Sequence, residues 1–376
     1  MTGWREWADR EAARVRDAGQ WRAPRDLDAA GPEGKLAPDG RPVVSFASND
    51  YLGLTQHPAV VRAAHDAIDR WGAGSGAARL IVGSRPVHSE LEQELAEWKH
   101  ADRAVLFTTG FAANLGVLTT FADPDVLVCS DELNHASLID GRRLAQAPLA
   151  VYRHRDAAHV DELLRESRAE RAVVVTETVF SMDGDVAPLD DLIDACARHG
   201  ALLVIDEAHA VLGPSPDPTG TTDVDVLRVG TLSKTMGALG GFVAGPERYT
   251  QLLVNRARSY IFTTASSPAD AAAALAALRV VRSPEGDTLR ARLRANIDRL
   301  APGHPSPIIP YICGSEARAL DAAAALLDLG LLVTAIRPPT VPQGTSRLRV
   351  TVSAAHSAEQ VDTLADALHV LFPETG

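Results

Sequence analysis

The chain has 376 residues, of which 46% are hydrophobic and 23% charged, and its formal net charge at pH 7 is -12. A chain of this length is expected to divide into more than one compact unit. The negative charge argues against a nucleic-acid partner, because phosphate backbones are bound by clustered lysines and arginines. Any anionic ligand would therefore need a local pocket.

Cysteine usage and the N-terminal residues indicate the cell compartment. Cys129, Cys196 and Cys313 are far apart and form no C-x-x-C pair, which predicts reduced core thiols and a cytoplasmic location. The first twenty residues mix Trp4 and Trp7 with many charges, and they predict an amphipathic helix rather than a signal peptide. No later stretch approaches the length of a membrane span, so we expect no membrane partner.

From residue 45 onward, short apolar runs alternate with helical patterns, which is typical of a mostly parallel sheet covered by helices on both faces. The predicted strands are 104–108, 126–129, 172–177, 201–206, 226–231 and 241–244, and the predicted helices include 60–71, 87–99, 161–168 and 189–199. The pattern changes near residue 284, before a charged helix over 288–300. We therefore predict an N-terminal helical arm over 1–45, a large α/β domain over 46–284 and a smaller C-terminal α+β domain over 285–376.

One buried strand ends in Asp206-Glu207-Ala208-His209, a pattern that fits two kinds of protein. In a nucleoside triphosphatase or helicase these acids would hold magnesium, but that reading needs an upstream G-x-x-x-x-G-K-[ST] loop, which the sequence lacks. In an open α/β sheet, a carboxylate at the carboxyl end of a strand faces the ligand. Asp206 could then pair with a protonated pyridine nitrogen, and His209 could steady the phenolic oxygen of the same ring. An aspartate that caps the following turn is the other alternative.

Lys234 follows a second apolar strand and precedes a run of small residues over 237–241. A lysine between a strand end and a glycine-rich turn is suited to imine formation. A lone lysine is more often a solvated surface residue, but the preceding Asp206 strand favours the imine.

Further candidates follow other predicted strands. Gly110 and Phe111 open a helix, and the free N–H groups at such a start can hold a phosphate, although a plain strand-to-helix turn is the alternative. Ser181 and Thr231 place hydroxyls at neighbouring strand ends. His135 is either a structural histidine or part of the ligand pocket.

Two other sequence patterns resemble known ligand sites, but their neighbouring residues do not fit those sites. Residues 72–77 match the dinucleotide pattern G-x-G-x-x-G/A but follow a predicted helix instead of a strand. Glu132 and His135 have the spacing of a carboxylate-bridged iron site, but such sites need a second copy, so we expect no metal.

Taken together, the motifs resemble those of the α-oxoamine synthases, a family of enzymes that depend on pyridoxal 5'-phosphate (PLP). The resemblance covers nearly the whole chain and rests on Phe46-Ala47-Ser48-Asn49-Asp50-Tyr51-Leu52-Gly53-Leu54, Asn134-His135-Ala136-Ser137, Phe180-Ser181-Met182-Asp183-Gly184-Asp185, Asp206-Glu207-Ala208-His209 and Thr231-Leu232-Ser233-Lys234. It implies the aminotransferase-like fold, type I, of PLP-dependent transferases. It also implies that Lys234 forms the Schiff base, with Asp206 on the pyridine nitrogen, His209 on the phenolic oxygen and His135 stacked over the ring.

The same resemblance implies the remaining contacts. Around the cofactor it places Gly110, Phe111, Ser181 and Thr231. Asn49 and Arg349 would hold the carboxylate of an amino acid, while Thr340 and an arginine of the arm would contact substrate. Arg22 is preferred for that arginine and Arg25 is the alternative.

A homodimer with shared active sites is also implied, in which Thr264 reaches the phosphate site of the partner. The segment over 260–268 places three apolar side chains beside a hydroxyl-rich turn, which fits a buried contact between subunits. A loop packed on its own domain is the alternative.

The stretch over 337–349, with its paired prolines, resembles the version found in family members that make biotin precursors. Those enzymes condense L-alanine with a pimeloyl thioester, carried on CoA or a carrier protein, and release carbon dioxide. Members that use glycine, of the 2-amino-3-ketobutyrate or 5-aminolevulinate type, are the alternative. The loop over 210–217 is shorter than usual in the family and lacks its Gly-Arg-Gly element.

Overall fold

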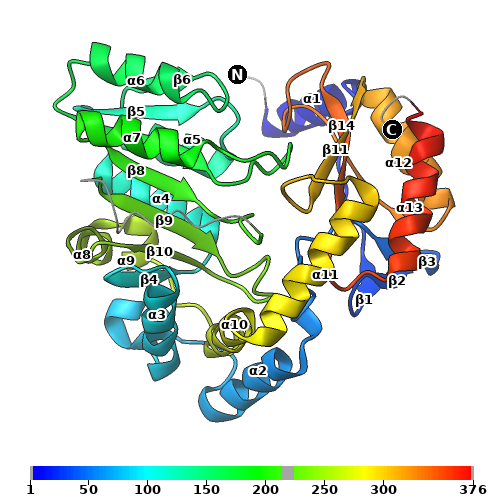
Figure 1. Ribbon diagram of the computed structural model, residues 1–376, viewed down its shortest axis with the longest axis horizontal. Coiled ribbons are helices and arrows are strands. Elements are labelled where there is room, and N and C mark those ends of the chain that lie inside the picture. The colour runs from blue at the N-terminus through cyan, green and yellow to red at the C-terminus, as the bar shows by residue number, and fades with distance from the viewer. Residues whose placement is uncertain (1–2, 213–223, 374–376) are drawn as a thin grey trace. The chain divides into compact units, whose positions relative to one another are not determined.

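The computed structural model describes residues 3–212 and 224–373 (Figure 1). It divides into two compact units. Unit 1 contains the chain up to Ser48, Ile308–Val352 and the chain from His356, and unit 2 contains Asn49–Pro307 and Ser353–Ala355. The domain limits after residues 45 and 284 stay a prediction. Most of the loop over 210–217 lies outside the described residues.

Unit 2 is built on a seven-stranded sheet with the order β4-β10-β9-β8-β7-β5-β6. Its strands are β4 (Arg103–Phe107), β5 (Val126–Asp131), β6 (Leu149–Tyr152), β7 (Arg171–Glu177), β8 (Leu202–Asp206), β9 (Val226–Thr231) and β10 (Gly241–Gly245). Strands β5 to β9 are parallel, and β10 is antiparallel to both β9 and β4. The mostly parallel sheet and all six predicted strands are confirmed. Strand β6, a short edge strand that is only partly buried, was not predicted from the sequence.

Helices lie on both faces of this sheet, as predicted (Figure 1). The helices of unit 2 are α2 (Pro58–Trp71), α3 (Pro86–Trp98), α4 (Gly110–Phe121), α5 (Ala136–Ala145), α6 (Ala157–Glu166), α7 (Leu189–His199), α8 (Glu247–Arg256), α9 (Arg258–Ile261), α10 (Pro268–Val281) and α11 (Pro284–Leu300). Helix α6 begins four residues before the predicted start at 161, because the side chain of Asp156 caps it by accepting the N–H of His159. The glycine-rich stretch over 72–77 follows helix α2, which excludes the strand-first context of a dinucleotide site.

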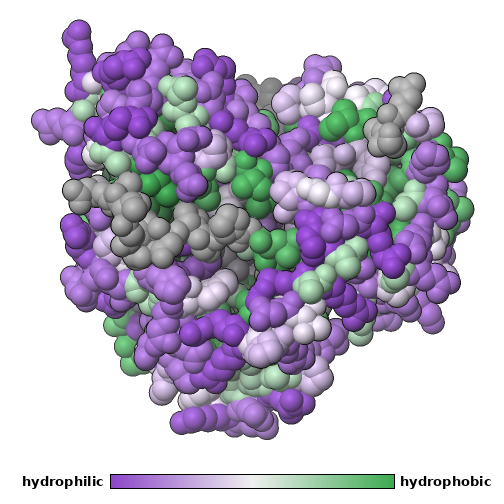
Figure 2. Space-filling model, viewed as in Figure 1, coloured by the Kyte–Doolittle hydropathy of each residue, from purple (hydrophilic) through white to green (hydrophobic). Residues whose placement is uncertain are grey.

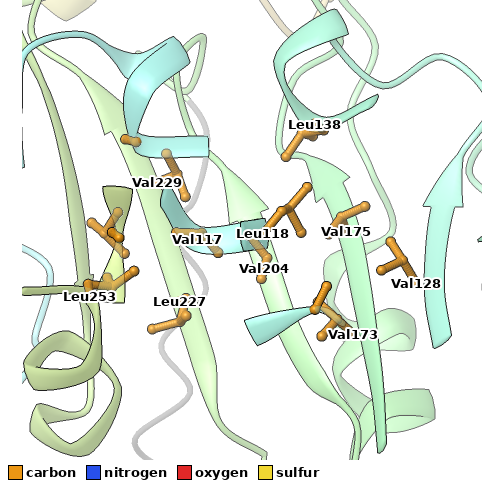
Figure 3. Close-up of a cluster of buried hydrophobic side chains, with 14 of the residues drawn as sticks. Val117, Leu118, Val128, Leu138, Val173, Val175, Val204, Leu227, Val229 and Leu253 are labelled. Carbon is orange, nitrogen blue, oxygen red and sulfur yellow. The ribbon is translucent and has the colours of Figure 1, made fainter. Parts of the chain in front are cut away.

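Successive residues of a strand point to opposite faces, and here both faces are buried. One face packs on α4, α5, α8 and α9 through a cluster that we call the α4 cluster (Figure 3), which includes Val117, Leu118, Val128, Leu138, Val173, Val175, Val204, Leu227, Val229 and Leu253. The other face packs on α6 and α7 through the α7 cluster, which includes Cys129, Tyr152, Val160, Val174, Phe180, Leu192, Cys196, Leu203 and Ile205. Burial on both faces explains the continuous apolar runs in the sequence.

The two clusters fix which way each strand end points. In β8, Val204 belongs to the α4 cluster and Ile205 to the α7 cluster, so Asp206 continues the α4 face. The outer surface over α6 and α7 is mainly hydrophilic (Figure 2). The three cysteines are free and buried, as expected from their spacing.

Unit 1 combines the N-terminal segment with the C-terminal part of the chain. Its elements are α1 (Trp4–Asp17), β1 (Leu27–Ala29), β2 (Glu33–Leu36), β3 (Arg41–Ser45), β11 (Ile308–Gly314), α12 (Glu316–Asp328), β12 (Leu331–Leu332), β13 (Thr334–Ile336), β14 (Ser346–Thr351) and α13 (Ala358–Leu371). Two sheets have the orders β1-β2-β3-β12 and β11-β14-β13. The predicted N-terminal helix is present as α1, and none of its residues is buried. Among all described residues, no helix is both long and apolar enough to cross a membrane.

Candidate functional site

The predicted site residues of unit 2 gather at the carboxyl ends of neighbouring strands. His135 follows β5, Ser181 follows β7, Asp206 ends β8 and Thr231 ends β9. Asp206 and Thr231 each lie two residues after a member of the α4 cluster, so their side chains project toward the α4 side. The first turn of α4 lies on this same side of the sheet. Lys234 follows in the turn between β9 and β10.

A chain of hydrogen bonds connects Lys234 to the start of unit 2. Its Nζ atom lies 2.8 Å from Nε2 of His209. Nδ1 of His209 is 2.7 Å from the hydroxyl oxygen of Tyr51, which donates at 2.9 Å to Oδ1 of Asn49. Tyr51 is fully buried, and it appeared in the sequence analysis only as part of a motif. Its hydroxyl brings His209 and Asn49, 160 positions apart in the chain, into one network.

The carboxylate of Asp206 accepts a hydrogen bond at each of its two oxygens. Oδ1 accepts the backbone N–H of Ala208 at 2.9 Å, which is the turn-capping contact. Oδ2 accepts a hydrogen bond from Nδ2 of Asn114 at 2.7 Å, inside the site. Asn114 lies on helix α4 and also donates to the hydroxyl of Ser137 at 2.9 Å. Asn114, one helical turn after Gly110, was not predicted from the sequence.

Glu207 points away from Asp206, toward the opposite face of the sheet. Its carboxylate is 2.6 Å from Nζ of Lys99 and 3.2 Å from Nη1 of Arg228, and all three side chains are buried. A buried carboxylate needs such partners, because an unpaired charge is costly inside a protein. Adjacent acids on opposite faces cannot share one magnesium ion, so the helicase reading loses its structural basis.

His135 caps helix α5 and is held through both its backbone and its ring. Its N–H donates to Oε1 of Glu177 at 2.7 Å, and its Nδ1 lies 2.8 Å from the hydroxyl of Ser137. Burial lowers the pKa of His135. The charge of Asp206 acts to raise this pKa and that of Lys234 acts to lower it, and the net effect is a lowered pKa. A neutral imidazole is the form suited to stacking on an aromatic ring.

Glu177, the last residue of β7, is a second residue that sequence reasoning missed. It is 2% exposed, and burial followed by the charge of Asp206 raises its pKa to about 8. Its carboxyl group accepts the backbone N–H of His135 and also that of Ser181. Nothing in the sequence marks it, because its position at a strand end beside Asp206 depends on strand order.

Gly110 and Phe111 form the first turn of α4, as predicted. Thr109 caps the helix by accepting the N–H of Ala112 at 3.0 Å. A Cβ atom on Gly110 would lie 3.2 Å from Cβ of Thr231, so these two residues are in close contact. The first N–H groups of a helix have no partner within it, and together with the helix dipole they favour an anion.

The turn after Lys234 depends on glycine. Gly237 has a φ of 61°, in the left-handed region, and a Cβ there would lie 2.5 Å from the backbone nitrogen of Thr55. The hydroxyl of Thr231 donates to the carbonyl oxygen of Gly240 at 3.1 Å, which closes the turn. Lys234 is therefore carried on a loop held at both ends.

Three predicted substrate residues belong to unit 1. Arg22 donates from Nη2 to the carbonyl oxygen of Pro338 at 3.3 Å, two residues before Thr340. Arg349 lies in the central strand β14 and is 7% exposed. Within unit 1, the structure thus brings the arm near Arg22 together with the loop that carries Thr340.

Thr264 follows helix α9 and is exposed, and it is not among the contacts of the site described above. The expectation that the segment over 260–268 exposes three apolar side chains is wrong for Tyr260. Its ring packs at 5.7 Å on that of Phe107 and is 6% exposed. Phe262 is 69% exposed.

The donor set fits PLP. It includes a lysine amine, a carboxylate at a strand end, a helix start able to hold a phosphate, and hydroxyls after β7 and at the end of β9, the strands on either side of β8. Oδ1 of Asn114, on the same side chain that donates to Asp206, is buried and has no hydrogen-bond partner, so an acceptor there is left for a ligand donor. Among residues 3–212 and 224–373, no group of three or more His, Cys, Asp and Glu side chains could hold a metal ion.

Comparison with known proteins agrees with this chemistry. A model of the family "Aminotransferase class I and II" matches residues 41–368. An 8-amino-7-oxononanoate synthase of Anaeromyxobacter dehalogenans (strain 2CP-1) is 50% identical over 366 residues, which cover 93% of this chain and 92% of that protein. The enzyme of the same name from Methylococcus capsulatus is 46% identical, with 96% of each chain covered.

Solved structures show the same architecture. A serine palmitoyltransferase from S. paucimobilis, with a bound PLP–myriocin aldimine, matches with a TM-score of 0.90 and 29% identity, covering 98% of this chain and 97% of that one. The 8-amino-7-oxononanoate synthase of Francisella tularensis matches with a TM-score of 0.73 and 27% identity, covering 88% and 97%.

Proposed function

Since the chain belongs to the aminotransferase class I and II family, we propose that it is a PLP-dependent 8-amino-7-oxononanoate synthase. The reaction condenses L-alanine with pimeloyl-CoA, or with pimeloyl-carrier protein, and releases carbon dioxide in biotin biosynthesis. Identity of 46–50% to such enzymes over at least 92% of both chains supports this activity. The fold is that of the type I PLP transferases.

The observation that carries the proposal is the position of Lys234 beside His209, on the same side of the sheet as Asp206. When bound, PLP supplies an electron sink for the carbanion formed at Cα of the amino acid. Lys234 would hold the cofactor through its side-chain amine, and that amine, once released, would accept the Cα proton of the amino acid. Asp206 keeps the pyridine nitrogen protonated, and His209 donates to the phenolic oxygen.

The other residues bind and orient. Gly110 and Phe111 hold the phosphate with their N–H groups, aided by the hydroxyls of Ser181 and Thr231. His135 stacks over the ring and contacts substrate. Asn49 and Arg349 bind the carboxylate of alanine, and Thr340 and Arg22 contact the acyl substrate.

We also propose that the protein works as a homodimer with shared active sites. An apolar patch of unit 2, formed by Leu80, Ile81, Val82 and Phe262, supports this, because each of these side chains is at least 51% exposed. The segment Arg79–Gly83 packs against α9, which Phe262 follows, so the four residues belong to one region. Thr264, two residues beyond Phe262, would then reach the phosphate site of the partner.

A cytoplasmic location is proposed as well. Three free, buried cysteines, Cys129, Cys196 and Cys313, suit a reducing compartment.

The test is an assay of the purified protein with alanine, glycine and serine, each against acyl-CoA thioesters of different lengths and against a pimeloyl-carrier protein. We expect carbon dioxide release with alanine and a pimeloyl thioester. A preference for glycine would favour the 2-amino-3-ketobutyrate or 5-aminolevulinate type. Preference for serine with a long acyl chain would instead match the activity named for the serine palmitoyltransferase neighbour.

A further inference from the structure

His154 follows strand β6 and has no role in the proposed reaction, yet both nitrogens of its ring contact carboxylates. Nδ1 lies 2.9 Å from Oδ1 of Asp131, and Nε2 lies 2.8 Å from Oδ2 of Asp185. Only the protonated imidazolium can donate at both nitrogens. Burial lowers the pKa of His154, but its hydrogen bonds to the two carboxylates outweigh burial and raise it to about 9.

Asp131 connects His154 to the segment that carries His135. It ends strand β5, and its side chain is fully buried. Its carboxylate also accepts the backbone N–H groups of Leu133 and Arg155, each at 2.9 Å. The short stretch from Asp131 to His135 is therefore held at its first residue, where the carboxylate of Asp131 contacts the ring of His154.

Asp185 connects His154 to the turn that carries Ser181. Within this turn, the N–H of Phe180 donates to the carbonyl oxygen of Asp185 at 3.0 Å, so Ser181 lies inside a closed loop. The ring of Phe180 meets that of His154 edge to face, with centroids 4.4 Å apart. His154 thus contacts the residues at both ends of the turn.

These contacts lie on the opposite face of the sheet from the site. Tyr152 and Phe180 belong to the α7 cluster, and so does Cys129, two residues before Asp131. The charged groups in contact with the His154 segment are Asp131 and Glu132 from the end of β5, Asp185 from the turn after β7, and Arg155 beside it. Three carboxylates face two cations there, and of these cations Arg155 pairs with Asp185 at 3.1 Å, so loss of the imidazolium charge leaves the carboxylate of Asp131 without its charged partner.

We propose that His154, as an imidazolium, is a positioning residue that holds the His135 segment and the Ser181 turn in the arrangement required by the site. This inference rests on the roles given to His135 and Ser181 in the proposed function. His154 itself touches neither substrate nor cofactor. It acts by joining the loops after β5, β6 and β7 on the α7 side of the sheet.

The first test compares the full-length variant His154→Gln with wild type by amide hydrogen exchange. His159→Gln is the matched control, because His159 lies five residues further on, in the first turn of α6, and its ring accepts the N–H of Arg153 rather than contacting a carboxylate of the site-bearing loops. We expect about tenfold faster exchange or more over 131–137 and 180–186, with strand β8 unchanged. Uniformly faster exchange, or no change in these two segments, would overturn the proposal.

The second test follows melting temperature with pH. The folded imidazolium loses its proton near pH 9, whereas an unfolded histidine does so near pH 6.5, so the stabilisation is complete below about 6.5 and lost above about 9. The difference in melting temperature between wild type and His154→Gln should therefore be largest near pH 6.5 and should disappear by about pH 10. A difference that is constant with pH would show that the ring only fills space, and would refute the role of its charge.

The third test measures the affinity for PLP by absorbance titration at pH 7. The dissociation constant should rise about 10- to 100-fold in His154→Gln, the range found when groups that orient ligands are removed at metal sites, and should not change in His159→Gln. If His154→Gln does not fold, Asp185→Asn replaces it, and faster exchange is then expected over 180–186 alone. Exchange and melting do not depend on turnover, so they decide the role of His154 even if the protein lacks the proposed activity.

Discussion

Nζ of Lys234 lies 2.8 Å from Nε2 of His209, so the amine proposed to form the imine is already in contact with the imidazole proposed to hold the phenolic oxygen. His209 follows strand β8, and the turn after the adjacent strand β9 carries Lys234. The pair therefore follows from the order of two parallel strands, and the predictions below concern the groups around it.

Lys234→Ala should abolish turnover and leave the fold intact. The variant loses both the imine and the base that removes the Cα proton, and a positioned base alone contributes about 10²–10⁴-fold. Steady-state assays and the absorbance of bound cofactor check the loss, and far-ultraviolet circular dichroism checks the fold. Normal turnover in a folded variant would contradict the assignment of Lys234.

Asp206→Asn should keep the fold and lose most of the rate. A hydrogen bond to a charged group is worth about 1.5–3 kcal/mol, which corresponds to roughly a 10- to 100-fold weaker hold on the protonated ring. Titration with PLP measures the affinity, and a single-turnover assay measures the rate. Magnesium-dependent ATP hydrolysis that is present in wild type and lost here would instead support the nucleoside triphosphatase reading.

Tyr51→Phe should slow the reaction about tenfold or more, because it removes the hydroxyl that orients His209 and contacts Asn49. It should also cost about 1–3 kcal/mol of unfolding free energy, since the buried His209 and the partly buried Asn49 each lose a partner. Tyr152→Phe is the matched control: that hydroxyl donates to the carbonyl oxygen of Val175 on the α7 side, away from the site. Equal rate losses in both variants would argue against a specific role for Tyr51.

Glu177→Gln should change the pH dependence of stability in the cofactor-free protein. The pKa of Glu177 is raised to about 8 in the folded state, against an ordinary value of 4.5, so the folded state binds the extra proton. Wild-type stability should therefore fall between about pH 4.5 and 8, as this buried carboxyl group is forced to ionise. The variant cannot ionise there, so its melting temperature should fall less over that interval. Parallel curves for the two proteins would contradict the raised pKa.

Ile81→Asp should convert the protein to an inactive monomer, because it places a charge within the apolar patch. Sedimentation at low concentration measures the change in mass. Arg10→Asp, on the surface of α1 in unit 1, serves as a control for added negative charge.

Mixed dimers test the shared site directly. Lys234→Ala and Thr264→Asp chains should each be inactive alone, while half of the randomly mixed dimers should regain one complete site. That amounts to about a quarter of the wild-type activity. If mixing inactive parents restores no activity, Thr264 does not serve the site of its partner.

The sequence alone determined the nature of the sheet and the chemical groups at its edge. Apolar runs of four or five residues lead to Glu177 and Asp206 and are typical of strands buried on both faces, and period-2 alternation then sets which end residues share a face. Lys234 was identified because it lies between a strand end and a glycine-rich turn, and His209 because it follows Asp206 by three residues. The resemblance to a family added roles for Asn49, Arg22, Thr340 and Arg349, which no periodicity could assign.

Only the tertiary structure decided which strand ends are neighbours, and this determines the rest of the site. Strand β7 lies between β5 and β8, so Glu177 lies beside Asp206. Its carboxyl group also accepts the backbone N–H groups of His135 and Ser181. The packing of α4 across the same edge brings Asn114 to within 2.7 Å of Asp206. Tyr51 and His154 likewise contact residues that are distant in sequence. A local sequence pattern cannot predict such contacts, because burial and hydrogen bonding depend on how the strands are ordered.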